Sequence, residues 1–310
     1  MISRRTFLEA VSSTAAVAVT SSSLAASAFA GGGSSGPLVR RAIPSTGEML
    51  PVIGMGTSGS FEVSAGTPEY DALKEVLKVF VDGGGTVIDT APTYSVAEDV
   101  LGALLAEQSL RPKVWVATKL SGVRGREAGL EQFNHTLGRL KTDRVELLQV
   151  HNLGDLKTQL ALARELKADG KTRYVGVTHY VEGAQDELAD IVQAEKPDFL
   201  QINYSVVSRG AERRVLPLAR DLGIAVLINR AFEDGRLFQR VGDKPLPDWA
   251  AEAGISSWAQ AFLKYALSHP AVTSVIPATG KPHRQADNLK AGFGPDLTDP
   301  QRASLVAMLA

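Results

Sequence analysis

The sequence predicts a single-domain α/β fold, a (β/α)8 TIM barrel, and two observations lead to this prediction. From about residue 50 onward, short apolar, β-branched runs alternate with amphipathic helical segments. The chain beyond residue 30 is also long enough for one such barrel, which typically takes about 250 residues. An open, doubly wound sheet is the alternative, because its strands and helices alternate in the same order.

The expected strands are mostly apolar on both faces, as in a parallel sheet that is covered by helices. They are expected over residues 52–55, 86–89, 114–118, 144–150, 174–178, 199–203, 225–229 and 274–276. The first expected helix, 69–81, places Leu73, Val76, Leu77 and Phe80 at helical spacing. Further helices are expected over 131–140, 156–168, 185–194, 211–222 and 256–268, and left-handed glycine caps at Gly83, Gly170 and Gly223.

Composition excludes several classes of protein. The 310 residues contain no cysteine, which rules out disulfides, a thiolate nucleophile, an iron–sulfur cluster and Cys-bound zinc. The net charge of -1 and the pI of about 6.5 show no excess of positive charge, which nucleic-acid binding would require. No spacing of His or acidic residues points to a metal, so no metal site is expected.

Residues 1–30 have the pattern of an export signal. Arg4 and Arg5 form a twin-arginine pair, a weakly apolar stretch follows, and Ala28 and Ala30 offer a peptidase site. The stretch is too rich in Ser and Thr for a stable membrane anchor. We therefore expect recognition by the twin-arginine export machinery, which carries folded proteins, and a periplasmic location. Residues 31–41, which begin GGGSSG, are expected to form a flexible leader, and 42–310 the barrel.

The segment 54–59, GMGTSG, matches the G-x-G-x-x-G pattern of a Rossmann turn. That motif requires a helix that opens within it, so that the helix N-terminus meets the pyrophosphate. Here Gly66 and Pro68 delay the next helix, and no acidic residue follows a second strand at the right distance. We interpret the glycines as tight turns at the end of a strand.

A more informative set lies at the carboxyl ends of the expected strands, where barrel enzymes carry their chemistry. Asp89, Lys119 and His151 end three strands, and Tyr94 lies in the loop after Asp89. Each residue alone has an ordinary structural explanation, but together they predict a proton donor. A tyrosine pKa of about 10 would be lowered by the Lys119 ammonium. Asp89 would hold that ammonium, and His151 would hydrogen-bond a substrate carbonyl oxygen.

The chain resembles the aldo-keto reductases over essentially all of residues 42–292. The matching stretches, in order, are PVIGMGT, VIDTAPTYSVAEDVLG, VWVATK, LGRLKTDRVELLQVH, VGVTH, LQINYS and VIPATGKPHRQADN. The resemblance implies that Asp89, Tyr94, Lys119 and His151 are the catalytic tetrad, with Tyr94 as the proton donor. It also implies a nicotinamide cofactor that lies across the barrel mouth without a Rossmann domain.

The resemblance also implies contacts with the cofactor. Gln201 matches the residue that holds the carboxamide, and Arg284, Asp287 and Asn288 match the clamp on the adenosine phosphate. An arginine beside a helix N-terminus favours NADPH, with NADH as the alternative. The remaining expected contacts are Gly56, Thr57, Thr178, His179, Asn229, Thr279 and Lys281.

Three positions depart from the family pattern, and all three concern cofactor binding. Thr178-His179 stands where the family has Ser-Asn, Asn229 replaces an aromatic that stacks on the nicotinamide, and Ala278 replaces a phosphate-binding lysine. The connection 152–155 is short, which predicts an open substrate pocket. The tetrad itself is intact.

The function expected from these residues is the NADPH-dependent reduction of a small aldehyde or ketone to an alcohol. One alternative is a non-catalytic or weakly catalytic partner protein that senses the nicotinamide nucleotide. Another is a barrel hydrolase, which needs a pair of carboxylates at the rim. Only Asp89 is well placed for such a pair, because Glu98 is expected on the following helix.

Overall fold

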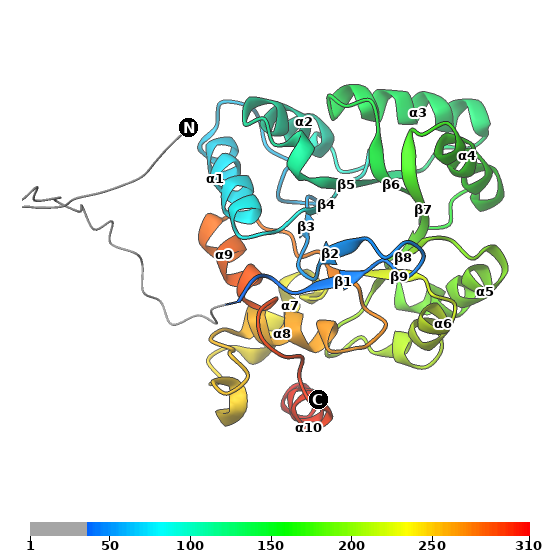
Figure 1. Cartoon of the computed structure of the whole chain (residues 1–310). Coiled ribbons are helices and arrows are strands. Elements are labelled where there is room, and N and C mark those ends of the chain that lie inside the picture. The colour runs from blue at the N-terminus through cyan, green and yellow to red at the C-terminus, as the bar shows by residue number, and fades with distance from the viewer. Residues whose placement is uncertain (1–35) are drawn as a thin grey trace, which may run out of the picture. The chain divides into compact units, whose positions relative to one another are not determined.

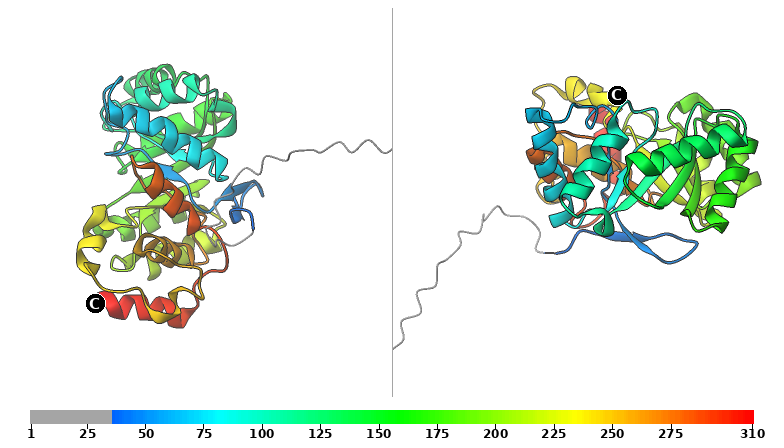
Figure 2. Two further views of the ribbon diagram at one scale, coloured as in Figure 1. Left: turned by 90° about the vertical axis from the view of Figure 1, so that its left-hand side faces the viewer. Right: turned by 90° about the horizontal axis from the view of Figure 1, so that it is seen from above.

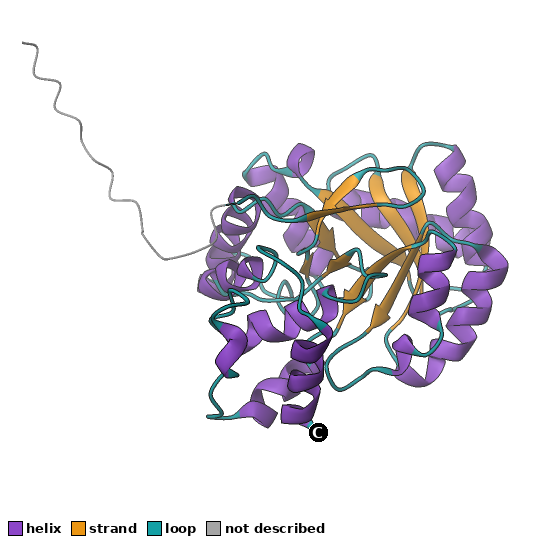
Figure 3. Ribbon diagram, turned by 60° about the horizontal axis from the view of Figure 1, so that its bottom comes forward, coloured by secondary structure: helices purple, strands orange, loops and turns teal. Residues whose placement is uncertain are grey.

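The computed structural model describes residues 36–310, which form a parallel eight-stranded barrel surrounded by helices (Figures 1 and 3). The strands lie side by side in chain order, and each pairs in parallel with the next. Bridges from Ile53 to Val275 and from Gly56 to Ala278 join the first strand to the last. This closure confirms the TIM barrel and excludes the open doubly wound sheet. The predicted signal, residues 1–30, lies outside the described residues.

The barrel strands agree closely with the expected runs. Their bounds are β3 Met55–Gly56, β4 Val87–Asp89, β5 Trp115–Leu120, β6 Val145–His151, β7 Thr172–His179, β8 Phe199–Asn203, β9 Ala225–Asn229 and β10 Ser274–Val275. The first run, 52–55, is the exception, because only its last residue enters β3 and Ile53 makes an isolated bridge. A short antiparallel hairpin, β1 Arg40–Ala42 and β2 Met49–Pro51, precedes the barrel.

Most α-helices of the described residues cover the outside of the barrel. Their bounds are α1 Pro68–Asp82, α2 Ala97–Glu107, α3 Arg126–Arg139, α4 Leu156–Ala168, α5 Gln185–Glu195, α6 Val215–Asp221, α7 Arg236–Val241, α8 Trp258–Leu267, α9 Pro282–Lys290 and α10 Asp299–Leu309. The helix expected over 211–222 starts late, because Arg214 leaves helical geometry (φ -144°) between a 3-10 turn and α6. Among residues 36–310, no helix has the length and apolarity that a membrane crossing needs.

Local signals explain where several helices begin and end. Thr67 caps α1 by accepting a hydrogen bond from the Tyr70 N–H, and Pro68 occupies the first turn. Gly170 and Gly223 adopt the expected left-handed conformation. The prediction for Gly83 is wrong: its φ is -78°, and the left-handed residue is Gly84. Glycine is favoured at position 83 for a steric reason, because a Cβ there would lie 2.6 Å from a methyl carbon of Leu289 in α9.

The hairpin covers the amino-terminal end of the barrel, where Figure 2 shows it as a blue ribbon beside the strands. Ile43 and Leu50 from the hairpin pack with the lowest inward-facing side chains of the barrel. Leu38 is buried as well, and the Arg41 guanidinium donates to the carbonyls of Leu267 and Val272 at 2.7 and 2.6 Å. Residues 38–41, expected to belong to the flexible leader, are therefore held by the barrel.

The inside of the barrel changes from apolar to polar along the strands. Because side chains alternate between the two faces of a strand, residues two apart point to the same face. The lower inward layer contains Val87, Trp115, Ala117, Leu147, Tyr174, Phe199 and Leu227. One inward position further along four of these strands stand Asp89, Lys119, Gln149 and Gln201, all buried. The sequence thus places a polar layer at the carboxyl ends of the strands.

Candidate active site

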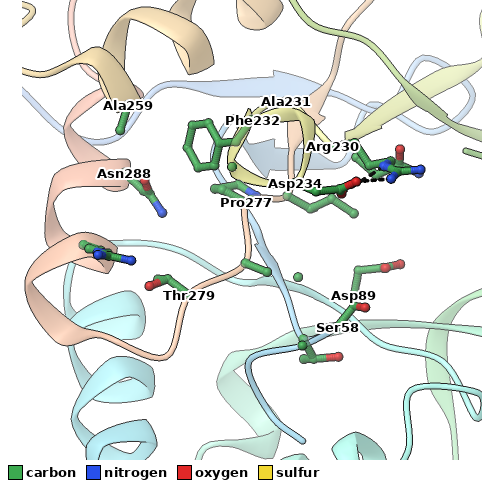
Figure 4. A pocket seen from close by; sticks show the side chains of 18 of the residues that line it. Ser58, Asp89, Arg230, Ala231, Phe232, Asp234, Ala259, Pro277, Thr279 and Asn288 are labelled. Atoms are coloured by element: carbon green, nitrogen blue, oxygen red, sulfur yellow. Dashed lines mark hydrogen bonds and ion pairs between the residues drawn. The ribbon is translucent and has the colours of Figure 1, made fainter. Parts of the chain in front are cut away.

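A cavity of about 1280 Å³ opens at the carboxyl ends of the barrel strands (Figure 4). It is larger than a typical drug-sized pocket and has room for an extended ligand. Asp89, Tyr94 and His151 line one part of it, and residues of α8 and α9 line another. This is the end of the barrel at which the sequence predicted the chemistry.

A buried ion pair lies at the cavity wall, to which Asp89 belongs. The Lys119 ammonium lies 2.6 Å from an oxygen of Asp89 and 2.8 Å from the carbonyl of Thr90. The second Asp89 oxygen accepts from the side-chain amides of Gln201 at 2.8 Å and Gln149 at 3.3 Å. Burial is the largest single effect on Lys119 and opposes its charge, but Asp89 and Tyr94 together outweigh burial and raise the pKa of Lys119. The pair is therefore charged and satisfied by hydrogen bonds.

Tyr94 and His151 lie directly beside this pair. The Lys119 ammonium is 5.1 Å from the centre of the Tyr94 ring, and the rings of Tyr94 and His151 meet edge-on with centres 6.0 Å apart. Burial raises the pKa of Tyr94 above its ordinary value of 10.0, and Lys119 offsets part of that rise. The predicted lowering of this pKa below 10 is therefore wrong. Tyr94 holds its proton at neutral pH and can donate it.

His151 is kept neutral by its surroundings. Burial, together with the nearby Lys119 charge, lowers the pKa of His151 from 6.5 to about 3. Its Nδ1 lies 2.5 Å from the hydroxyl of Ser121, which follows β5. A neutral imidazole has one N–H, and the ring can donate it toward the cavity when Nε2 carries the proton.

Most of the residues expected to bind a cofactor line the cavity, and two do not. His179 turns its Nδ1 to the backbone N–H of Val181 and stacks on Tyr180, and Lys281 is the exposed residue before α9. Neither side chain belongs to the cavity wall. The expected contacts in the wall are Gly56, Thr57, Thr178, Gln201, Asn229, Thr279, Arg284, Asp287 and Asn288.

The polar atoms of this wall differ in how they are engaged. Thr57 Oγ1 and Asn229 Oδ1 are buried and have no hydrogen-bond partner among the described residues. Gln201 Nε2 donates one N–H to Asp89, which leaves its second N–H available to a ligand. Asp287 accepts from Ser257 Oγ and Gln260 Nε2, both at 2.6 Å, and so ties α9 to the start of α8.

The sequence did not indicate the segment after β9. Arg230 and Asp234 form an ion pair on the cavity wall, as Figure 4 shows. The Arg230 guanidinium also lies 4.7 Å from the centre of the Tyr180 ring. Arg230 and Asp234 both have left-handed backbone (φ 54°), and no sequence motif predicts this conformation. Other cavity residues that were not among the expected cofactor contacts are Ser58, Gly59, Asn152, Ala231, Phe232, Gly235, Phe238, Ser257, Trp258, Ala259, Ile276, Pro277, Ala278 and His283.

The second carboxylate that the hydrolase alternative requires does not come from Glu98. This side chain is 1% exposed and accepts hydrogen bonds from Thr118 at 2.8 Å and Thr136 at 3.0 Å, away from the cavity. Asp234 lies on the cavity wall, but its carboxylate pairs with Arg230. Within residues 36–310, no group of three or more His, Asp or Glu side chains is placed to hold a metal ion.

Comparison with known proteins agrees with this geometry. The model of the Aldo/keto reductase family matches residues 52–309, so the chain belongs to this family. It is 30% identical to aldo-keto reductase YhdN of Bacillus subtilis over 60% of each chain, and thus spans less than two thirds of that relative. It is 27% identical to methylglyoxal reductase YeaE of Escherichia coli over 76% of this chain and 84% of that one.

A solved structure with a similar fold is the aldo-keto reductase of Klebsiella pneumoniae in complex with NADPH. It superposes with a TM-score of 0.73 at 27% identity, over 87% of this chain and 95% of that one. The similarity therefore extends over most of both chains.

Proposed function

We propose that this protein reduces a small aldehyde or ketone to an alcohol with NADPH, and that Tyr94 donates the proton. The observation that carries the proposal is the buried Lys119–Asp89 pair beside Tyr94 and a neutral His151 on one cavity wall. Family membership and a similar structure that holds NADPH support the same reaction.

The cavity wall fits a nicotinamide dinucleotide. Thr57 Oγ1 and Asn229 Oδ1 are buried polar atoms that lack partners within residues 36–310, as expected where a ligand completes the hydrogen bonds. Arg284, in the first turn of α9, offers a guanidinium for a 2'-phosphate. When bound, this cofactor supplies the hydride. Gln201 can still offer one N–H to the carboxamide.

The residues of the chain have separate tasks in the reaction. The His151 N–H donates to the carbonyl oxygen and fixes its approach. While the carbonyl carbon is reduced, the Tyr94 hydroxyl would donate its proton to the oxygen, and the alcohol forms. The Lys119 ammonium stabilises the phenolate that remains, and Asp89 holds the ammonium in place. Solvent then returns a proton to Tyr94.

Replacement of Tyr94 by Phe tests the proposed donor. We expect turnover to fall by about 10²–10⁴, the usual contribution of a general acid, while NADPH binding measured by fluorescence is retained. Tyr174→Phe, at the opposite end of the barrel, is the matched control and should retain turnover. Wild-type turnover in Tyr94→Phe would remove Tyr94 from this role. Wild-type protein that binds NADPH but never oxidises it with any carbonyl compound would favour the sensing alternative.

Cofactor preference is tested at Arg284. We expect Arg284→Leu to weaken NADPH binding by about tenfold, because it loses a charge-assisted hydrogen bond, and to leave NADH binding unchanged. Fluorescence titration with both nucleotides measures the two dissociation constants. An equal loss for both nucleotides would show that Arg284 does not recognise the 2'-phosphate.

We further propose that residues 1–30 direct the folded protein through the twin-arginine machinery to the periplasm. The Arg4-Arg5 pair and the Ala28 and Ala30 peptidase site support this proposal. A variant with both arginines changed to lysine should remain inside the cell as the uncleaved chain. Protein purified from the periplasm should carry bound nucleotide, since that compartment has no obvious NADPH supply. An unaffected variant would contradict this route.

A further inference from the structure

The residue that follows β5 connects to the tetrad through its side chain. Ser121 is 3% exposed, and its Oγ lies 2.5 Å from Nδ1 of His151. Within residues 36–310, His151 is the only hydrogen-bond partner of this hydroxyl. A buried hydroxyl needs an acceptor for its hydrogen. The lone pair of His151 Nδ1 is the acceptor available here.

The backbone of Ser121 is held in place by α3. The Ser121 N–H donates to Gln132 Oε1 at 2.8 Å, and Gln132 Nε2 donates to the Ser121 carbonyl at 2.8 Å. One amide side chain thus binds both backbone groups of Ser121. This clamp keeps the hydroxyl within reach of the imidazole.

The hydrogen-bond pattern distinguishes the two neutral forms of His151. If Nδ1 carried the proton, it would donate to Ser121 Oγ, and the Ser121 hydrogen would have no acceptor. If Nε2 carries the proton, Ser121 donates to Nδ1 and both groups are satisfied. The Lys119 charge disfavours a second positive charge on the ring, and Tyr94 and His179 are the other titratable groups near it.

We propose that Ser121 is a positioning residue that holds His151 with its proton on Nε2. The N–H opposite Ser121 then becomes the donor to the substrate carbonyl oxygen. The catalytic meaning of this assignment rests on the proposed function, while the tautomer itself is a property of the protein without substrate. The two can therefore be tested separately.

Long-range 15N–1H correlation NMR on protein labelled with 15N-histidine reads the tautomer, and His151→Gln identifies the His151 signals. We expect the proton on Nε2 in the wild type, a mixture of both tautomers in Ser121→Ala, and return to Nε2 in Ser121→Thr, which keeps the hydroxyl. A wild-type ring protonated at Nδ1 would overturn the proposal. So would a tautomer that does not change in Ser121→Ala.

Kinetics give a second readout. Loss of one hydrogen bond should lower kcat/KM for carbonyl reduction about two- to tenfold in Ser121→Ala, with NADPH affinity unchanged. The control is Ser304→Ala in α10, which removes a serine hydroxyl that accepts from Trp249 Nε1 at 3.1 Å, and it should keep wild-type kcat/KM. Equal losses in both variants would contradict a positioning role. Wild-type protein with the expected tautomer but no carbonyl reduction would contradict the proposed function alone.

Discussion

The two ends of the barrel interior are built from the same strands and have different tasks. At the amino-terminal end, Trp115, Tyr174 and Phe199 pack with ring centres 5.4 to 6.0 Å apart beneath the hairpin. At the carboxyl end, Lys119 and Asp89 form the buried pair. The distance along β5 from Trp115 to Lys119 is only two inward-facing positions.

This contrast shows how one scaffold separates stability from chemistry. The aromatic end gains free energy by burying apolar surface, which needs no exact protonation state. The polar end costs free energy unless every buried charge keeps its partners. Substitutions at the two ends should therefore separate effects on folding from effects on turnover.

The largest effect is expected from Lys119→Met at the polar end. Asp89 would keep only the amide donors of Gln149 and Gln201, and Tyr94 would lose its neighbouring cation. We expect the free energy of unfolding to fall by about 3–5 kcal/mol. Turnover per folded molecule should fall by about 10²–10⁴. Chemical denaturation and initial rates measure the two quantities.

The matched control for this variant is Lys264→Met. Lys264 is also buried, but its ammonium donates to the carbonyls of Phe293 and Pro295, outside the cavity. This variant should lose stability and keep turnover per folded molecule. If Lys119→Met also kept its turnover, the polar end would be structural only.

Trp115→Ala tests the aromatic end. Truncation of a large buried side chain should lower the free energy of unfolding by about 3–5 kcal/mol and leave turnover per folded molecule unchanged. Trp115→Phe should cost less, because Trp115 Nε1 has no hydrogen-bond partner among the described residues. Denaturant titration measures both variants. A large loss of turnover in Trp115→Phe, which keeps a ring, would show that the two ends are coupled.

A smaller effect is expected where the hairpin meets the barrel. The Tyr174 hydroxyl donates to Glu48 at 2.6 Å and lies 2.9 Å from Thr46 Oγ1. Tyr174→Phe should lower the free energy of unfolding by about 0.5–1.5 kcal/mol. Thermal unfolding should show a decrease in Tm of roughly 2–4 °C per kcal/mol. An unchanged Tm would mean that the Tyr174 hydroxyl does not help to hold the hairpin.

The sequence predicted that the tetrad residues lie at the polar end, but not their detailed contacts or the direction of the Tyr94 pKa shift. Parallel strands end at one rim, so Asp89, Lys119 and His151 could be placed together from strand ends alone. Gln149 lies inside a strand, and its contact with Asp89 depends on the register of neighbouring strands, which the chain does not reveal by itself. The direction of the Tyr94 pKa depends on burial, which follows only from the folded structure.

The rest of the cavity was harder to foresee for a different reason. Arg230 and Asp234 lie in an irregular segment with left-handed backbone. Arg230 also contacts Tyr180, which follows a different strand, β7. Periodicity describes helices and strands, so it says nothing about such a loop. The strand ranges 199–203 and 225–229, which follow regular patterns, agree with β8 and β9.

The smallest expected effect is that of pH on turnover, and it tests His151. Because the pKa of His151 is lowered to about 3, the ring stays neutral at every pH well above that value. The pKa of His151 in the folded protein lies below its unfolded value of about 6.5. The contribution of His151 to the free energy of unfolding is therefore complete above pH 6.5 and is lost as the pH falls toward 3. We expect kcat/KM to change less than about twofold between about pH 5 and 8.

The control for this prediction is His151→Gln, which removes the titrating ring and should show the same flat profile at lower activity. Initial rates with NADPH in a buffer series of constant ionic strength measure both proteins. A loss of wild-type activity with a midpoint near pH 6.5, absent from His151→Gln, would show an ordinary imidazole. In that case Lys119 and burial would not keep His151 neutral, and the polar end would hold a second cation that its hydrogen bonds do not accommodate.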